Sequence, residues 1–276
     1  MYKKILIALD LEGVNNVCGV AYSGLGHGSA EWDAARRQAA DEVNCAARAL
    51  FDAGAQRVAV WDNHGSGKNI IPDQLDPRIE LIEVDTAQPR MYFAADGAFD
   101  CICFFGYHAM EGTLGGVLAH TMNSSMIQHY KLNGKHIGEV DMDAYIAASH
   151  RIPAVFFAGG DITCAQAKRV LPHLVTVVTK QELSRNEAVY KDNTLLFNEI
   201  KREITAAINT EMPLIPCSFP ATLEKSFKRT EDAAKYLLQL REMGIEAEHP
   251  ADDILGRDAH TVTATVHNIS QFICCI

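Results

Sequence analysis

The stretch KKILIALDLEG, residues 3–13, places a continuous apolar run directly before two carboxylates. Residues 5–9 have the composition of a buried strand, and Asp10 and Glu12 follow it with one residue between them. Side chains two residues apart on an extended chain point to the same side. The two carboxylates should therefore face one point, where their repulsion favours a bound divalent cation. A solvated turn at the strand end is the alternative interpretation.

Two later strands are expected to end in the same way. In RVAVWDNHGSGKN, residues 58–61 precede Asp62 and His64, and in CICFFGYHAM, residues 101–105 precede His108. Asp62 and His64 would share a face, which suits a histidine ligand whose ring is held by an acidic neighbour. The alternative is an Asx-type turn formed by Asp62, with His64 exposed. In open α/β sheets, ligands bind outside the carboxyl ends of the strands, so we expect these side chains to meet there.

Two further polar residues follow the third of these strands. His120 lies in GGVLAHTM, twelve residues after His108. Glu139 lies in NGKHIGEVDMDAY, where Asn133-Gly134 indicates a hairpin turn and a helical run follows the glutamate. Each has a structural alternative, because the helix dipole favours an acid in a first turn without any ligand role, and His120 could be a core histidine bonded to backbone. Imidazole and carboxylate groups are also the ligands that suit zinc.

Apolar strands alternate with amphipathic helices through most of the chain. Apolar residues recur at three- and four-residue steps over residues 31–53, which predicts a helix before the strand at 57–61. A strand, a helix and a second strand in this order form a parallel crossover. The pattern continues with a helix over 140–149, a strand over 153–158, a helix over 161–170 and a strand over 174–178. We therefore expect an α/β fold, with a mostly parallel sheet flanked by helices.

The C-terminal part of the sequence has a different organisation. A long amphipathic helix is expected over 186–209, and a cluster of prolines after it indicates a linker. Beyond the linker the sequence predicts a strand over 217–226, a helix over 230–243 and a strand over 261–266. We expect residues 1–212 to form an α/β core that contains the candidate ligands, and residues 213–276 to form a smaller α+β portion packed on it.

Composition limits the classes of function. The chain has 276 residues and a net charge of −10, without a basic cluster, which argues against a nucleic-acid partner. No apolar run approaches the roughly 18 residues of a membrane span, and the apolar segment after Lys4 runs straight into Asp10, as a first strand would and a signal peptide would not. The eight cysteines form no C-x-x-C pair, so we expect free thiols and a cytoplasmic location.

The motifs LDLEG, DNHGSGKN, FFGYHA, AHTM and GE with a following Ala-Tyr, in this order, resemble the D-aminopeptidase family of two-zinc peptidases (DppA type, peptidase family M55). AGGD at residues 158–161 and the stretch TKQELSRNEA match the family's pattern as well. The resemblance is clear over residues 3–190. One departure is Ile162, where the family often has a second acid after the aspartate of AGGD. This departure questions a substrate-side role for the segment and leaves the candidate metal ligands intact.

The resemblance implies an aminopeptidase that releases the N-terminal residue from short peptides, with a preference for D-amino-acid peptides such as D-Ala-D-Ala. A metal-activated water would be the nucleophile, and His120 would be a catalytic residue that does not bind metal. The resemblance also implies a ring-like homo-oligomer, such as a decamer, with short peptides as its partners. Neither the assembly nor the chirality of the substrate can be derived from the residues themselves.

The resemblance further implies five ligands for two zinc ions per chain: Asp10, Glu12, His64, His108 and Glu139. Asp10 would bridge the two ions. Glu12 and His108 would complete one ion, and His64 and Glu139 would complete the other. Two zinc ions against three carboxylates would leave a positive centre, which stabilises a developing oxyanion.

Two other classes of function remain open at the level of sequence. A two-metal phosphoesterase would also use aspartate and histidine at strand ends, but it would need basic residues that clamp phosphate, and Lys68 is the one such residue within the five ordered motifs. A non-catalytic metal-binding protein is the second alternative, and it predicts that His120 is dispensable.

Overall fold

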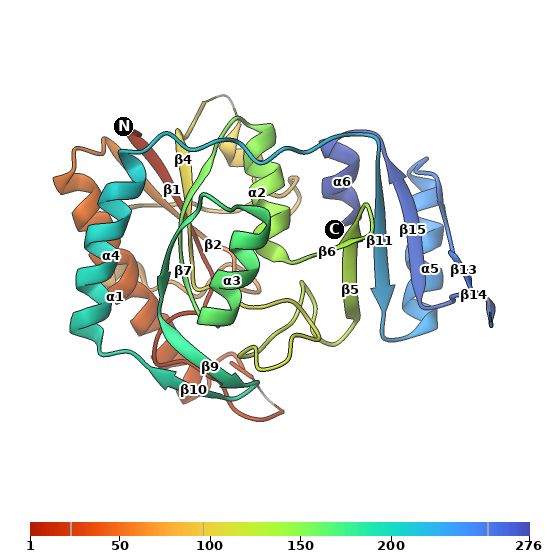
Figure 1. Ribbon diagram of the computed structural model, residues 1–276, viewed down its shortest axis with the longest axis horizontal. Coiled ribbons are helices and arrows are strands. Elements are labelled where there is room, and N and C mark those ends of the chain that lie inside the picture. Colours follow the sequence, from red (N-terminus) through yellow and green to blue (C-terminus); the bar gives the residue numbers. More distant parts are fainter. Residues whose placement is uncertain (23, 96, 253) are drawn as a thin grey trace.

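The computed structural model describes residues 1–22, 24–95, 97–252 and 254–276. Within these residues a six-stranded parallel sheet has the order β3-β2-β1-β4-β7-β8 (Figure 1). Its strands are β1 (Lys4–Leu9), β2 (Arg57–Asp62), β3 (Glu80–Leu81), β4 (Cys101–Phe105), β7 (Ala154–Gly159) and β8 (Val175–Val178). The chain adds strands on one side of β1 and then crosses to β4 on the other side. The carboxyl ends of β1 and β4 therefore flank the crevice where a sheet of this order binds ligands.

Helices cover both faces of this sheet, which explains why β1 and β4 are apolar throughout. Helices α1 (Ala30–Asp52) and α4 (Asn193–Ile208) lie on one face, and α2 (Glu139–Ser149) and α3 (Asp161–Val170) lie on the other (Figure 1). The hydroxyl of Ser29 caps α1 by accepting a hydrogen bond from the Trp32 N–H. The expected α/β fold, a mostly parallel sheet flanked by helices, is confirmed.

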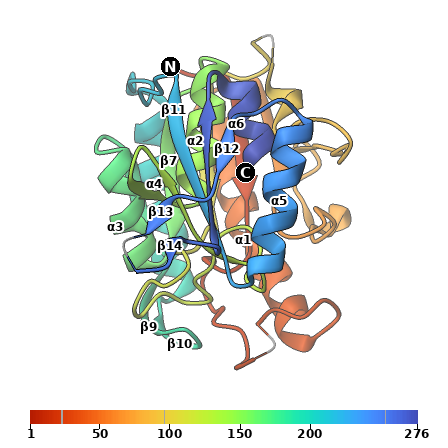
Figure 2. The ribbon, with the colours of Figure 1, turned by 90° about the vertical axis from the view of Figure 1, so that its right-hand side faces the viewer.

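The described residues also form a five-stranded antiparallel sheet, whose strands lie side by side at the right of Figure 1; Figure 2 views the molecule from this end. Its order is β12 (Ala247–Glu248), β15 (Thr261–Val266), β11 (Ala221–Phe227), β5 (Ile127–Leu132) and β6 (Lys135–Ile137). Helix α5 (Thr230–Glu242) packs on β11 and β15, and α6 (Ile269–Cys275) lies against β15 and α2. The β5–β6 hairpin, which turns at Asn133-Gly134 as expected, thus comes from the expected core but pairs with the C-terminal portion. The division at residue 212 stays a prediction.

Smaller elements complete the chain. The hairpin of β9 (Lys180–Ser184) and β10 (Glu187–Tyr190) lies at the bottom of Figure 1, and β13 (Ala251–Asp252) pairs with β14 (Gly256–Arg257). Short 3₁₀ turns span Pro72–Gln74 and Tyr92–Ala94. All eight cysteines, which lie within the described ranges, are unpaired. No helix in the described residues combines the length and the apolar character needed to cross a membrane.

Two predicted boundaries were wrong. The helix expected over 186–209 begins only at Asn193, because residues 187–190 pair with β9 as strand β10. The carboxylate of Asp192 then caps α4 by accepting from the N–H groups of Thr194 and Leu195. The strand expected over 217–226 begins at Ala221, directly after Pro220, whose lack of an N–H removes a ladder hydrogen bond.

Candidate metal centre

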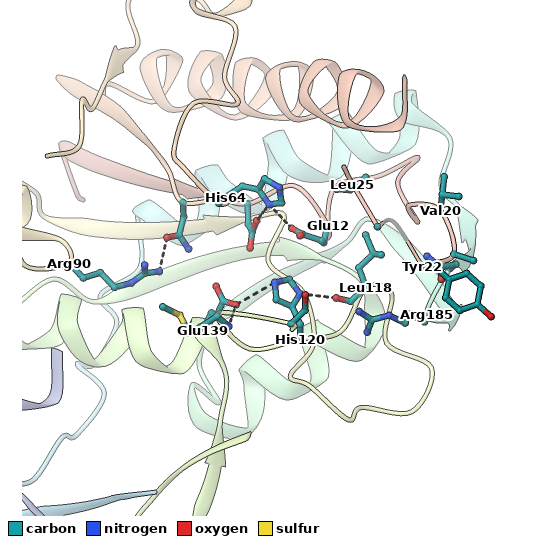
Figure 3. Close-up of a pocket in the computed structure, with 18 residues that line it drawn as sticks. Glu12, Val20, Tyr22, Leu25, His64, Arg90, Leu118, His120, Glu139 and Arg185 are labelled. Atoms are coloured by element: carbon teal, nitrogen blue, oxygen red, sulfur yellow. Dashed lines mark hydrogen bonds and ion pairs between the residues drawn. The ribbon is translucent and has the colours of Figure 1, made fainter. Parts of the chain in front are cut away.

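Carboxylate and imidazole groups from four parts of the chain meet at the carboxyl ends of β1, β2 and β4 (Figure 3). Asp10 and Glu12 follow β1, His64 follows β2, His108 follows β4, and Glu139 is the first residue of α2. In the described residues they form overlapping groups whose ligand atoms lie within 4.8 Å of one another. The structure thus brings together all five side chains that the sequence pointed to.

Asp10 lies at the centre of this cluster, next to both His64 and His108. Its Oδ1 lies 2.9 Å from Nδ1 of His64, which is also 3.1 Å from Oε2 of Glu12. Its Oδ2 lies 3.5 Å from Nε2 of His108, which is 3.3 Å from Oε1 of Glu139. The two oxygens of Asp10 therefore face two half-sites. The shortest distances place Glu12 beside His64 and Glu139 beside His108, a different pairing from the one implied by the resemblance.

The environment of His108 fits a metal ion. Its Nδ1 lies 3.1 Å from the carbonyl of Ala109, which can only accept, so Nδ1 carries a proton and Nε2 is the nitrogen that can offer a lone pair to a metal. This Nε2 is buried and has no hydrogen-bond partner in the part of the chain that the structure describes, although two carboxylates lie next to it. An unpaired imidazole nitrogen between carboxylates is the arrangement expected of a zinc ligand whose other nitrogen is held by a carbonyl.

The pKa values of the cluster also indicate an excess of negative charge, which a bound cation would balance. Burial, reinforced by Glu12, raises the pKa of Asp10 to about 7. Burial disfavours the charged forms of His64 and His108, but the surrounding carboxylates outweigh it and raise the imidazole pKa values to about 11 and about 10. Burial likewise opposes ionisation of Glu139, yet His108 lowers the pKa of Glu139 to about 2. Without metal the carboxylates would draw protons onto the imidazoles, and bound cations would replace those protons.

His120 lies at the edge of the cluster. Its ring stacks on the His108 ring, with centroids 3.7 Å apart and planes at 13°. Its Nδ1 lies 2.8 Å from the Leu118 carbonyl, and its Nε2 lies 3.9 Å from Oε1 of Glu139. Burial and then the neighbouring His108 lower the pKa of His120. A neutral imidazole with a free Nε2 that lines the cavity can accept a proton.

Of the two interpretations of Asp62, the structure supports the turn and not the support of the His64 ring. Its carboxylate accepts hydrogen bonds from the N–H groups of Asn69 (2.6 Å) and Ile70 (3.0 Å) and from the Asn69 side chain (2.9 Å). It contacts His64 only through the backbone N–H, at 3.3 Å. Asp62 therefore closes the loop after β2, as in the Asx-type alternative, while the His64 ring is held by Asp10 and Glu12.

Two buried charged residues hold the loop that carries Glu12. The sequence did not predict this role for either of them. The Lys180 ammonium, at the start of β9, donates hydrogen bonds to the backbone carbonyls of Glu12, Val14 and Val17. From α1, the fully buried Glu42 accepts a hydrogen bond from the Asn15 N–H at 2.8 Å. Lys180 lies in the motif TKQELSRNEA, but no local pattern connects it to a loop so far away in sequence.

A second hydrogen-bond network that the sequence did not predict surrounds Arg90. Its guanidinium donates to both oxygens of Asp143, at 2.6 and 2.8 Å, and to the side-chain Oδ1 of Asn63 at 2.6 Å. The hydroxyl of Tyr107, the residue before the candidate ligand His108, donates to Asp143 at 2.7 Å. This network therefore braces the segments after β2 and β4 against α2. Its members are spread from residue 63 to residue 143, so no spacing in the sequence indicates it.

The AGGD motif contacts Glu182 through the close approach of its backbone and through the Asp161 carboxylate. The buried Glu182 carboxylate accepts from the Val117 N–H at 2.7 Å and from the Ile162 N–H at 3.0 Å. A Cβ on Gly160 would lie 2.2 Å from Oε2 of Glu182, so this close approach requires glycine. Asp161 accepts from the Glu182 N–H at 2.8 Å. Ile162 contributes only its backbone N–H to this contact, so the departure at this position leaves the contact intact.

A cavity of about 860 Å³ opens over the cluster (Figure 3). Asp10, Glu12, His64, His120 and Glu139 line it on one side. Val20, Tyr22 and Leu25 lie on the other side, with Leu118 and Arg185. The ligand atoms are thus reached from solvent through a pocket large enough for a small molecule.

Known proteins resemble this chain in sequence and in fold. A D-aminopeptidase of Bacillus subtilis (strain 168) is 28% identical over 183 residues, which are 66% of this chain and 65% of that protein, so the match spans under two thirds of the relative's length. The solved structure "Zn-dependent D-aminopeptidase DppA from Bacillus subtilis, a self-compartmentalizing protease" has a TM-score of 0.86 at 22% identity, covers 99% of this chain and 94% of its own, and shows the same fold. A family model described as D-aminopeptidase matches residues 3–243. The chain therefore belongs to the D-aminopeptidase family.

Proposed function

We propose that this protein is a two-zinc aminopeptidase that removes the N-terminal residue from short peptides, with a preference for D-amino-acid peptides such as D-Ala-D-Ala. The observation that carries the proposal is the unpartnered Nε2 of His108, which lies between the carboxylates of Asp10 and Glu139 at the base of a cavity. Family membership and the names of the relatives support zinc and the D-preference.

Asp10 would contribute one oxygen to each zinc ion. Glu12 and His64 would complete the ion at Oδ1 of Asp10, and His108 and Glu139 would complete the ion at Oδ2. This assignment follows the shortest distances and replaces the pairing implied by the resemblance. A pair of zinc ions, when bound, supplies a water with its pKa lowered to about 7 and a positive centre for the scissile carbonyl.

His120 would move the proton. Because its Nδ1–H is directed at the Leu118 carbonyl, Nε2 is the nitrogen that can accept a proton from the attacking water. The same nitrogen could then return that proton to the leaving amine. The stacked His108 ring fixes the plane of the His120 ring, so the proton moves along one defined direction.

We further propose a ring-like homo-oligomer, such as a decamer, in the cytoplasm. The name of the structural relative, a self-compartmentalizing protease, supports an assembly. Large apolar side chains are exposed on the β9–β10 hairpin and on the loops beside the cavity: Tyr22, Leu114, Leu183, Val189 and Tyr190. Such a concentration is typical of a protein interface. The eight unpaired cysteines support a reducing compartment.

The phosphoesterase alternative is less favoured by the cavity. Lys68 does not line it, and Arg90, which does, is already bound to Asp143, so among the described lysines and arginines that line the cavity Arg185 alone would have to hold the phosphate. Hydrolysis of p-nitrophenyl phosphate without hydrolysis of aminoacyl-p-nitroanilides would nevertheless decide for that alternative. A non-catalytic metal-binding role would leave the zinc-loaded protein inactive on both substrates.

The proposal is tested by zinc analysis of the purified protein together with hydrolysis of D-Ala-D-Ala and L-Ala-L-Ala. We expect about two zinc ions per chain and faster cleavage of the D-dipeptide. Cleavage of the L-dipeptide alone would overturn the chirality and leave the peptidase function standing. Absence of zinc from protein prepared in excess zinc would overturn the metal centre itself.

A further inference from the structure

Two arginines line the cavity, on opposite sides of the acid–imidazole cluster (Figure 3). Arg90 lies beyond Glu139 and has its charge matched, because both oxygens of Asp143 bind its guanidinium and Asn63 accepts a third hydrogen bond. Arg185 lies on the His120 side, beside Leu118. The two arginines therefore have to be considered separately, because the charge of Arg90 is already balanced by Asp143.

Arg185 has no acidic partner among the residues that the structure describes. It lies in the turn between β9 and β10 and is exposed at the cavity. Its Nη1 donates to the carbonyl of Ala119, the residue before His120, and its own carbonyl accepts from the Leu118 N–H at 2.8 Å. These contacts fix the guanidinium beside the catalytic histidine. They use one of its five N–H donors, so the fork that recognises carboxylates bidentately remains available.

Outside the acid–imidazole cluster, no acidic residue among the described residues around the cavity could pair with Arg185 in place of a substrate carboxylate. The acidic residues among its lining residues are Asp10, Glu12 and Glu139, which all belong to the cluster. Leu25 and Leu118 contribute apolar surface between the cluster and Arg185, as suits a small apolar side chain. The cavity thus offers metal ligands at one place and a single unmatched cation at another.

We propose that Arg185 binds the free C-terminal carboxylate of the peptide substrate, and so selects unblocked di- and tripeptides. This inference rests on the proposed aminopeptidase function. With the N-terminal residue at the cluster, each further residue extends the chain by at most about 3.6 Å. Because the guanidinium is bonded to the residue next to His120, a carboxylate one or two residues beyond the scissile bond would reach it. Longer peptides would place their carboxylate beyond Arg185.

The test compares D-Ala-D-Ala with D-Ala-D-Ala amide, which has the same scissile bond and no terminal charge. We expect the zinc-loaded wild type to prefer the free acid by roughly ten- to a hundredfold in kcat/KM, the contribution of a charge-assisted bidentate pair. Arg185→Gln should lose most of this preference by losing activity on the acid, with activity on the amide within about threefold of wild type. Arg185→Lys should retain part of the preference, because it keeps the charge and loses the fork.

Three outcomes separate the possibilities. Equal wild-type kcat/KM for acid and amide would overturn the role of Arg185 while the aminopeptidase function stands. An equal loss on both substrates in Arg185→Gln would also overturn it, because that loss means that Arg185 only positions His120. Cleavage of neither substrate by the wild type would overturn the proposed function and this inference with it. Arg202→Gln, an exposed arginine on α4 paired with its neighbour Glu203, is the matched control.

Discussion

The side-chain ammonium of Lys180 donates a hydrogen bond to the backbone carbonyl of Glu12, which lies 168 residues earlier in the chain. The same ammonium bonds the carbonyls of Val14 (3.0 Å) and Val17, and burial lowers its pKa to about 8. A buried cation is costly unless its donors are satisfied, and here three carbonyls satisfy them. The candidate ligand Glu12 thus depends for its position on a residue that does not touch the cluster itself.

Replacing Lys180 with methionine should loosen the loop at residues 12–17. The variant leaves three carbonyls without their donor, and we expect the free energy of unfolding to fall by about 2–4 kcal/mol. Zinc affinity should fall with it, by roughly tenfold, because Glu12 loses its support. Urea unfolding of the metal-free protein and zinc competition with a chelator measure the two effects. Lys235→Met, at an exposed position on α5, is the control, and an unfolding free energy equal to that of the control would contradict the role assigned to Lys180.

Glu42 should make stability depend on pH. Burial raises the pKa of this carboxyl from its ordinary value of 4.5 to about 7 in the folded protein. The folded state therefore holds the proton more tightly than the unfolded chain does. The resulting stability is fully present below about pH 4.5 and is lost as the pH rises to about 7, with a total of about 3 kcal/mol.

Glu42→Gln cannot ionise, so its stability relative to the wild type should increase from about pH 5 to about pH 8. The amide oxygen can still accept from the Asn15 N–H, as Oε1 of Glu42 does at 2.8 Å. Urea unfolding in the presence of a chelator, across this pH range, measures the difference without interference from metal binding. Asp41→Asn removes an exposed carboxylate from the next position on α1 and serves as control. A difference between Glu42→Gln and wild type that stays constant with pH would refute the expectation.

His120→Ala should separate metal binding from turnover. The proposal assigns His120 to proton transfer, so we expect kcat to fall by about 10²–10⁴-fold while the zinc content per chain stays at its wild-type value. Metal analysis and a D-Ala-D-Ala hydrolysis assay on the same preparation provide both measurements. Loss of one zinc ion would instead make His120 a ligand, a role that its closeness to Glu12 and His108 makes geometrically accessible. Unchanged turnover would favour the non-catalytic alternative.

The sequence predicted the parts of the site that depend on local patterns. An extended chain after β1 was expected to put Asp10 and Glu12 on one side; the two carboxylates do meet at His64, but residues 11–13 form a bend and a turn. The rule for open α/β sheets predicted that the ends of β1, β2 and β4 would meet. The sequence could not predict partners that are set by tertiary packing. Lys180 and Glu182 lie in a hairpin whose second strand falls within the helix predicted over 186–209, so the hairpin was not predicted. Arg90 and Asp143 are 53 residues apart, and no spacing connects them. The same limit applies to the pairing of ligands, which depends on rotamers and not on spacing.

The pairing can be tested by counting metal ions in double variants. In the structure, His64 and Glu12 share the half-site at Oδ1 of Asp10, and Glu139 lies beside His108 at Oδ2. His64→Ala combined with Glu12→Gln should therefore lose one zinc ion and keep the other. His64→Ala combined with Glu139→Gln damages both half-sites and should lose both ions.

The pairing implied by the family resemblance gives the opposite result, because there His64 and Glu139 bind the same ion. Under that pairing the second double variant would keep one zinc ion, and the first would lose both. Asp10→Ala is the reference for complete loss, because it removes both oxygens, one from each half-site. Equilibrium dialysis against buffered zinc, followed by metal analysis, gives the number of ions per chain. Retention of one ion by His64→Ala with Glu139→Gln would show that the contacts around Asp10 rearrange when metal binds.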